Sequence, residues 1–170
     1  MTKKAFTLIE LTIVLVLLSI FIGAVLLIFV VQLKAWGSSL NRTVIRQQGH
    51  QALSRMVREL NQTNSITSAS SNALTFLADL DDNGSDETII LSTSGNNLNR
   101  TEGAVIVPLA FNVQSFSLTY RDSSNNILTP PAGTDTQVER DTIKVVGLSL
   151  TMTKADETLN ISSSAYLHNQ

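Results

Sequence analysis

A charge-free apolar run at residues 11–31 is the most prominent hydrophobic pattern of the chain. The run contains 21 residues, and Thr12, Ser19 and Gly23 are its only weak interruptions. As an α-helix it would be about 31 Å long, which matches the hydrocarbon thickness of a bilayer. The pattern therefore predicts a helix that can cross a membrane once.

After this run, apolar residues recur at spacings that suit one face of a helix, and no proline occurs before Pro108. We therefore expect one continuous helix over residues 6–60, with a length of about 80 Å. Gly37 and Gly49 are weak interior points of its second half, because glycine costs up to about 1 kcal/mol relative to alanine. The recurring apolar residues are Leu33, Trp36, Leu40, Val44, Leu53, Met56, Val57 and Leu60.

The helical periodicity ends at the polar residues 61–65, and residues 68–72 continue as a polar connector. Strand-like segments separated by turn residues follow, and several of them alternate between apolar and polar positions. Such alternation suits an antiparallel sheet with one face against the helix, so we predict an α+β fold. The expected strands are 73–80, 87–93, 103–107, 113–121, 142–153 and 159–167, with one long variable loop at 122–141.

Composition and charge narrow the functional classes. The 170 residues include no cysteine, which excludes a disulfide scaffold, thiol catalysis and a cysteine-based zinc site. Residues 34–59 carry a net charge of plus four, from five basic residues and one acid, whereas residues 60–170 carry minus seven, from five basic and twelve acidic residues. Because DNA-binding faces gather positive charge, direct binding of nucleic acid by the C-terminal part is not expected. The basic half-helix could meet anionic lipid headgroups or acidic faces of neighbouring subunits, or it could be an ordinary solvated face.

Glu10 lies at the start of the apolar run. A charged residue at mid-bilayer costs roughly 2.5 to 3.5 kcal/mol, so a carboxylate beside such a segment needs a partner or a function. An ordinary secretory signal has a shorter apolar core and a small-x-small cleavage site, which residues 31–36 do not offer. The apolar segment is therefore expected to stay in the mature protein. Two lysines before it are nearly balanced by three cations soon after it, so charge does not set its orientation.

A short basic leader, a small residue and the run Phe6-Thr7-Leu8-Ile9-Glu10 before a long apolar helix resemble the class III signal of type IV pilins and pseudopilins. The resemblance implies that a membrane-embedded aspartyl prepilin peptidase cuts between Ala5 and Phe6. It also implies that Phe6 becomes the N-methylated first residue and that Glu10 becomes the fifth residue of the mature chain. Glycine is the usual residue before the cut, and Ala5 is a small substitute for it.

Cleavage would give Phe6 an α-amine with a reference pKa near 8, mostly protonated at neutral pH, and N-methylation would keep its charge. In a filament, the amine of one subunit could meet the Glu10 carboxylate of the next inside the apolar bundle. Such a pair compensates two charges that are each costly alone, so Glu10 is the expected subunit-assembly residue. The alternative is a plain signal anchor, in which Glu10 lies at the headgroup level and the helix dipole favours it.

Fragments of the C-terminal part resemble minor pilins of the PilW type and J-type pseudopilins. The resemblance implies a pilin fold, in which a long helix with a membrane-spanning half and an amphipathic half packs against an antiparallel β-sheet head. The implied domains are a leader peptide at 1–5, a transmembrane and assembly helix at 6–32, the amphipathic half of the helix at 33–61, and a β-rich globular head at 62–170. The fragments that carry the resemblance are residues 74–76, 79–84, 98–100, 108–110 and 112–113.

For function, the resemblance implies a minor pilin-like subunit that assembles into, or primes, a type IV pilus. The alternatives are a pseudopilin of a type II secretion system, a subunit of a DNA-uptake (competence) filament and, in another class, a membrane-anchored ligand-binding envelope protein. The implied partners are other pilins or pseudopilins, the prepilin peptidase, an inner-membrane assembly platform and the lipid bilayer. The implied location is the bacterial inner membrane with an exported head, followed by a cell-surface or periplasm-spanning filament.

Residues 79–87 resemble the first part of an EF-hand loop, with oxygen-bearing side chains at alternate positions around Gly84. The twelfth position is Ile90 instead of the usual bidentate glutamate, and calcium needs six to eight oxygens. A polar hairpin turn is therefore favoured over a metal site, and calcium binding is expected to be weak or absent; no other cofactor is expected. The calcium candidates are Asp79, Asp81, Asn83, Ser85 and Glu87.

The sequence contains no recognisable catalytic constellation. His50 and His168 are its only two histidines, and it has no G-x-S-x-G, Walker or H-E-x-x-H motif. The serines have no evident base partner. We therefore predict that the protein is not an enzyme and that its work is assembly.

Overall fold

A computed structural model describes residues 7–128 and 137–167 of the chain. The chain divides into two compact units, residues 1–40 and residues 41–170. One helix of 54 residues, α1 (Leu8–Asn61), begins in the first unit and ends in the second. The sequence therefore predicted this helix correctly as one continuous element, to within two residues at its start and one at its end.

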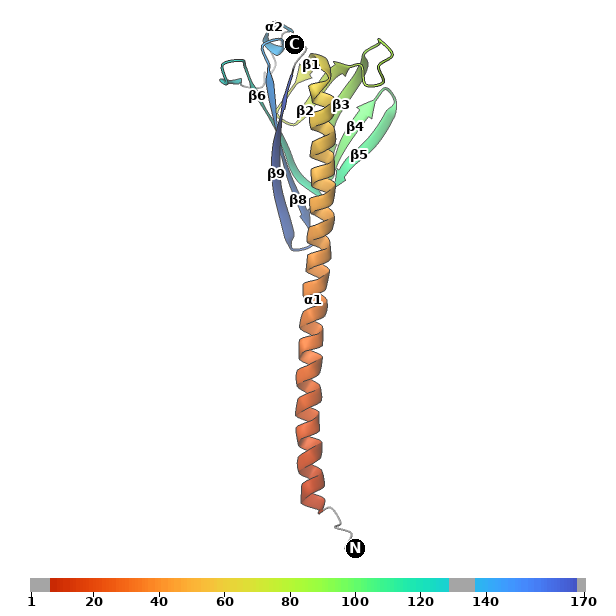
Figure 1. Ribbon diagram of the computed structural model, residues 1–170, viewed down its shortest axis with the longest axis vertical. Helices are drawn as coiled ribbons and strands as arrows, with labels where there is room; N and C mark the ends of the chain where they lie inside the picture. The colour runs from red at the N-terminus through yellow and green to blue at the C-terminus, as the bar shows by residue number, and fades with distance from the viewer. Residues whose placement is uncertain (1–6, 129–136, 168–170) are drawn as a thin grey trace. The chain divides into compact units, whose positions relative to one another are not determined.

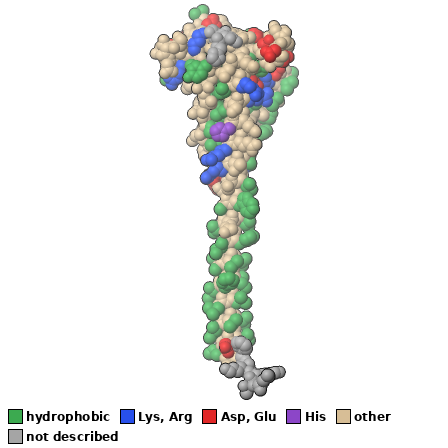
Figure 2. Space-filling view, viewed as in Figure 1, with side chains coloured by type: hydrophobic (Ala, Val, Ile, Leu, Met, Phe, Trp, Pro, Cys, Tyr) green, Lys and Arg blue, Asp and Glu red, His purple; other side chains and the backbone are tan. Residues whose placement is uncertain are grey.

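The first unit presents an apolar helical surface. Its share of α1 contains an 18-residue window with a mean hydropathy of 3.3, and none of that window is buried, so the helix is long and apolar enough to cross a membrane. Figure 2 shows hydrophobic side chains over the visible face of this stretch. Such a surface requires lipid or other apolar helices as its surroundings.

The second unit contains two antiparallel sheets and the C-terminal half of α1 (Figure 1). The first sheet has the strand order β1-β2-β3-β4-β5, and the second has the order β7-β6-β8-β9. Its elements are β1 (Thr63–Ala69), β2 (Ala73–Ala78), β3 (Glu87–Ser94), β4 (Asn97–Glu102), β5 (Val105–Phe111), β6 (Val113–Arg121), β7 (Ile127–Leu128), α2 (Gln137–Arg140), β8 (Val145–Lys154) and β9 (Glu157–Tyr166).

One core lies between the helix and the inner faces of both sheets. The helix contributes a stripe of buried residues at three- and four-residue spacing, namely Ile45, Gly49, Ala52, Leu53, Met56, Glu59 and Leu60. The strands contribute alternate residues, such as Leu148, Leu150 and Met152 of β8. The predicted α+β architecture, with a long helix packed against antiparallel strands, is confirmed, although the strands form two sheets where the sequence suggested one.

The polar segments predicted at 61–65 and 68–72 are wrong in part, because residues 63–69 form β1. The register of β1 against β2 shifts between Thr63 and Ser65 and again between Ile66 and Ser68. Each bulge adds one residue to the strand, so its buried residues Thr63, Ile66 and Ala69 recur every three positions and not every two. The alternation on which strand prediction relies is therefore absent from this segment.

Strand β4 was also not predicted, and β7 and α2 lie within the segment predicted as one long loop. The inward positions of β4 hold Leu98 and Arg100, and both are buried. An arginine at an inward position hides the alternation of the strand. Its burial is explained by an acid on α1.

Arg100 and Glu59 form an ion pair across the interface between β4 and α1. Both residues are 5% exposed, and Arg100 Nε donates to Glu59 Oε2 over 2.8 Å. Arg100 Nη1 also donates to Glu102 Oε2 over 2.7 Å, and Arg55 Nε donates to Glu59 Oε1 over 2.9 Å. Burial lowers the pKa of the Arg100 guanidinium, but the hydrogen bonds and charges of Glu59 and Glu102 outweigh burial, so the net shift of the pKa is upward. Arg100 is therefore charged at every working pH.

At Gly49, α1 packs closely against the second sheet. A Cβ atom at this position would lie 2.5 Å from Ile161 Cδ1, 3.1 Å from Met152 Sδ and 3.4 Å from Leu159 Cδ2. Glycine has a low helix propensity, but at position 49 its lack of a side chain lets the helix pack on β8 and β9. Gly37, in contrast, has nothing within 4 Å of such a Cβ.

We predict that Arg100→Met lowers the free energy of unfolding by about 3 kcal/mol, because it leaves a buried carboxylate with only the half-exposed Arg55 as its partner. Denaturant unfolding of the full chain in detergent measures this loss. Combining Arg100→Met with Glu59→Met should recover most of it, since a well-packed apolar pair replaces the buried charges. The control Glu102→Gln, at a half-exposed position, should cost less than about 1 kcal/mol. A double variant as unstable as Arg100→Met would contradict this account.

We predict that Gly49→Ala destabilises the second unit although alanine favours a helix by up to about 1 kcal/mol. The new methyl group would meet Ile161 Cδ1, Met152 Sδ and Leu159 Cδ2 together, so turning the end of the Ile161 side chain does not clear all three contacts, and overpacking of this kind costs about 1 to 3 kcal/mol. Thermal unfolding measures the net effect. The matched control Gly37→Ala meets no neighbour and should leave the unfolding temperature unchanged or raise it, so equal behaviour of the two variants would disprove the close-packing role of Gly49.

Candidate functional site

Glu10 lies in the first turn of α1 and is exposed. Thr7, immediately before the helix, caps it: Thr7 Oγ1 accepts from the backbone N of Glu10 over 3.3 Å, and Thr7 O accepts from the backbone N of Glu10 and of Leu11. The pair Thr7 and Glu10 has the Thr-x-x-Glu spacing of a capping box. The sequence motif therefore also specifies where the helix begins, a role that sequence analysis missed although the spacing was readable.

The helix N-terminus favours the Glu10 carboxylate by about 0.3 to 1 kcal/mol. This gain does not offset the roughly 2.5 to 3.5 kcal/mol that a charge costs within an apolar phase. Among the residues that the structure describes, no cation forms an ion pair with Glu10. The helix therefore presents, beside its apolar surface, one acid that its own described neighbours do not neutralise.

The predicted cleavage and methylation sites, Ala5 and Phe6, lie outside the described residues, so their processing stays a prediction. The family comparison bears on the motif itself. Residues 1–26 match the model of the prokaryotic N-terminal methylation motif. The N-terminal segment is therefore that of a type IV pilin-like protein. No curated protein matches the chain at a significant level.

The methylation motif and the long apolar helix together bear on where the protein is located and how it is processed. A class III signal followed by an exposed apolar helix supports membrane anchoring and export of the β-rich part. It also supports processing by a prepilin peptidase and assembly with other pilin-like helices.

The acidic loop joins β2 and β3, as the predicted hairpin turn requires. Asp79 accepts hydrogen bonds from the backbone N of Asn83 and of Gly84, over 3.1 and 2.8 Å, and Asp81 accepts from the backbone N and the side-chain amide of Asn83. Gly84 has a φ of 83°, which an L side chain rarely adopts. The loop is therefore a closed turn held by its own carboxylates.

Glu87 is brought back to Asp79 by the register of the hairpin, in which Ala78 pairs with Glu87. Glu87 Oε2 accepts from the backbone N of Leu80 over 3.0 Å. Ligand oxygens of Asp79, Asp81 and Glu87 all lie within 4.8 Å of one another. Three of the five sequence candidates thus converge, whereas Asn83 Oδ1 accepts from the backbone N of Ser85.

Carboxylate oxygens are suitable ligands for calcium, but only three carboxylates converge in this loop. Three carboxylates supply at most six oxygens, and several of these oxygens already accept hydrogen bonds from the loop amides. Calcium takes six to eight oxygens. The predicted hairpin turn is confirmed. Weak or absent calcium binding stays a prediction.

The basic half of α1 is partly engaged within the chain. Arg42 forms a bidentate ion pair with Glu157 at the start of β9, with Nε–Oε2 at 2.9 Å and Nη2–Oε1 at 3.1 Å. Arg55 pairs with Glu59. Arg46 and Arg58 are exposed on the same half-helix, so the surface that could meet an acidic partner is smaller than the sequence suggested.

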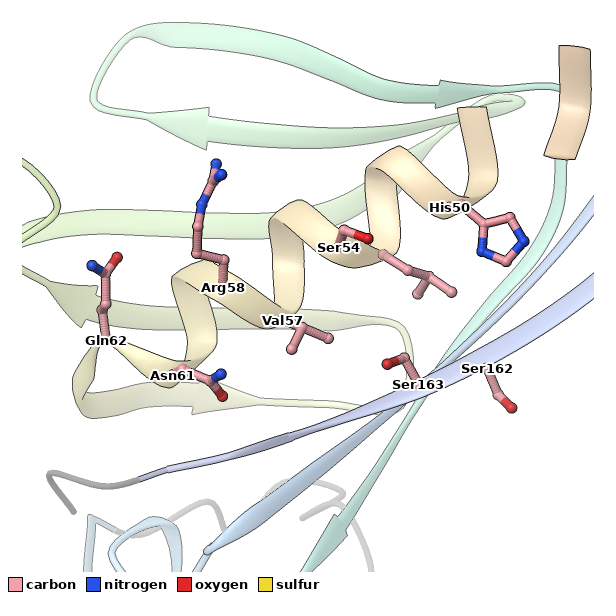
Figure 3. A pocket seen from close by; sticks show the side chains of 9 residues that line it. His50, Ser54, Val57, Arg58, Asn61, Gln62, Ser162 and Ser163 are labelled. Carbon is pink, nitrogen blue, oxygen red and sulfur yellow. The ribbon is translucent and has the colours of Figure 1, made fainter. Parts of the chain in front are cut away.

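His50 is exposed on α1 and lines a hollow of about 540 Å³ beside β9, while His168 lies outside the described residues. The other lining residues are Leu53, Ser54, Val57, Arg58, Asn61, Gln62, Ser162 and Ser163, as Figure 3 shows for the labelled ones. A single histidine among serines and amides, without an acid beside it, is not a catalytic arrangement. Sequence analysis could not have found this hollow, because its two walls are about one hundred residues apart.

We predict that the acidic loop binds calcium weakly, with a dissociation constant no tighter than about 10⁻⁴ M, because only three carboxylates converge. Isothermal titration calorimetry of calcium into the full chain measures this, with Asp81→Asn as the variant that removes one ligand charge. Asp156→Asn, in the exposed turn between β8 and β9, is the matched control. Submicromolar binding that Asp81→Asn abolishes would show that other oxygens complete the site.

Proposed function

We propose that the protein is a minor pilin-like subunit that assembles through its N-terminal helix into a type IV pilus or primes one. The observation that carries this proposal is Glu10, an exposed acid in the first turn of a helix whose apolar surface is bare. In a bundle of such helices, the methylated amine of Phe6 on one subunit neutralises the Glu10 carboxylate of its neighbour. Packed side chains replace lipid contacts along the rest of the helix.

Two related functions use the same assembly chemistry: the pseudopilin of a type II secretion system and a subunit of a DNA-uptake filament. Their helix would need the same acid and the same processed amine, so they differ from the pilus in their partners. The pilin-like motif and architecture favour a non-enzymatic subunit in all three. The inner membrane, with its assembly platform, is the proposed site of insertion.

A membrane-anchored envelope protein that binds a ligand is the candidate from another class. Such an anchor would keep its leader or lose it at another place, and it would not need Glu10. Mass spectrometry of the mature N-terminus separates the classes. N-methylated Phe6 supports the pilin-like subunit, whereas an intact Met1 or a cut elsewhere supports the anchor.

We predict that Glu10→Ala leaves membrane insertion intact but lowers incorporation into filaments by more than tenfold. The variant leaves the neighbouring amine unpaired in an apolar bundle, at a cost of roughly 2.5 to 3.5 kcal/mol, and each 1.4 kcal/mol corresponds to a factor of ten. Sheared filaments and total membranes are compared by immunoblotting.

Two controls accompany this measurement. Thr12→Ala removes a hydroxyl that only bonds the carbonyl of Ile9 within the same helix, so it should assemble normally. Glu10→Asp keeps the charge on a shorter side chain and should lose less than Glu10→Ala. Normal incorporation of Glu10→Ala would rule out the proposed charge pairing.

A further inference from the structure

Strand β9 forms the outer edge of the second sheet. No strand within residues 7–128 and 137–167 pairs with its free side. The strand is ten residues long and contains no proline and no lysine, and its one acid, Glu157 at the start, bonds Arg42. It therefore lacks the charges and prolines that usually protect an exposed edge from pairing with another chain.

Two hollows meet at this edge. The helix-side hollow, of about 540 Å³, lies between α1 and β9, and the outer-face hollow, of about 810 Å³, lies on the solvent face of the sheet. Ser162 and Ser163 line both hollows. The edge at these two residues is thus open on both of its faces.

The helix-side hollow lies next to the close contact of Gly49 with Leu159 and Ile161. Its β9 wall, Ser162 and Ser163, directly follows Ile161, and its helix wall extends to Val57 and Asn61. Figure 3 shows Ser163 directed toward the helix and Ser162 directed away from it, as alternation along a strand requires. The apolar walls of this hollow are Leu53 and Val57, so it suits an apolar side chain.

The outer-face hollow exists because the sheet carries small side chains there. Ser164, Gly147 and Thr119 lie in one row across β9, β8 and β6. A Cβ atom on Gly147 would clash with Thr119 Oγ1, so these two residues form the closed floor of the hollow. Arg121, Lys144 and the exposed ring of Tyr166 complete the lining.

The charges around the edge oppose those of the rest of the β-rich part. The ionisable side chains lining the two hollows are Arg58, Arg121, Lys144, His50, Tyr166 and a single acid, Asp122. Hydrogen bonds from the side chain and backbone of Asn126 lower the pKa of Asp122, so this acid is ionised at neutral pH. The two linings together therefore hold three cations and one negative charge. Residues 60–170 as a whole carry minus seven. A locally positive edge on an acidic head attracts an acidic partner.

We propose that the β9 edge at Ser162 to Tyr166 binds an extended acidic peptide segment of a partner protein by strand addition. Main-chain hydrogen bonds to β9 hold the segment, and its alternate side chains enter the two hollows, apolar ones on the helix side and acidic or hydroxyl-bearing ones on the outer face. Pairing of β9 with β9 of a second copy is disfavoured, because it brings two sets of cations together. This interaction uses residues of the second unit and is separate from helix assembly through Glu10.

The test uses the full chain in detergent micelles and a fluorescein-labelled heptapeptide of alternating valine and aspartate. We expect saturable binding in fluorescence polarisation, and slowed hydrogen exchange at the amides of residues 162–166. Replacement of aspartate by lysine in the peptide should weaken binding by at least tenfold. Equal binding of the lysine peptide, or no binding up to millimolar concentration, overturns the proposal.

Backbone methylation separates strand addition from other docking. In a strand, alternate residues direct their N–H groups to the same edge, so a peptide N-methylated at its valines and one N-methylated at its aspartates each block one edge. One of the two N-methylated peptides should bind the protein at least tenfold more weakly than the unmethylated peptide, and the other should bind as tightly as the unmethylated peptide. Equal affinity of both for the protein overturns strand addition.

A protein variant tests the helix-side hollow. Ser54→Trp places a large ring into it from an exposed helix position and should weaken binding of the valine-aspartate peptide at least tenfold, whereas Gln51→Trp, exposed on the same helix but outside the lining, should not. Concentration-dependent self-association that the peptide displaces would assign the edge to a second copy and overturn the acidic-peptide assignment. The Glu10→Ala variant should bind the peptide normally, so failure of this proposal and failure of filament assembly are told apart.

Discussion

The ion pair between Glu59 and Arg100 is the contact that fixes how the helix lies on the first sheet. A purely apolar interface tolerates sliding by a turn or by a strand, because one aliphatic contact replaces another at little cost. A buried charge does not, since leaving either partner unpaired costs several kcal/mol. The pair therefore selects one register of α1 against β4, whether or not it adds net stability. Gly49 makes a second close contact, ten residues earlier on the helix, because a glycine leaves room there for Met152 of β8 and for Leu159 and Ile161 of β9.

These two residues also show where sequence-based reasoning succeeds and where it stops. The helix was predictable because the apolar run at 11–31 is followed by apolar residues at helical spacing up to Leu60, and no proline interrupts either part. Strands β2, β3, β6, β8 and β9 were predictable because their inward and outward residues alternate. Arg100 hides the alternation of its strand, and Gly49 is a weak point of its helix. Each is explained only by residues far away in the chain, Glu59 for Arg100 and Ile161 for Gly49. Strand β1 failed for a different reason, since two bulges change its period from two to three.

The candidate site divides in the same way. Glu10 was identifiable from the sequence because a single acid at the start of a long apolar run is anomalous by itself. The acidic loop was identifiable from its composition, but the convergence of Glu87 with Asp79 and Asp81 depends on the pairing of β2 with β3. The open edge of β9 could not be predicted, because a strand becomes an edge only when the order of the whole sheet is known.

Glu10 and Glu59 lie on the same helix and show how burial assigns a carboxylate its role. Glu59 is buried and has two arginines of its own chain within 3 Å, so its charge is satisfied as soon as the second unit folds. Glu10 is exposed on the apolar half and forms no ion pair among the described residues. In water such an acid needs no partner, but an apolar phase removes the solvent that stabilises it. In the proposed assembly, a neighbouring helix with a free amine at its start supplies the cation that compensates Glu10. Folding thus pairs the buried acid in one half of α1, and the proposed assembly would pair the acid in the other half.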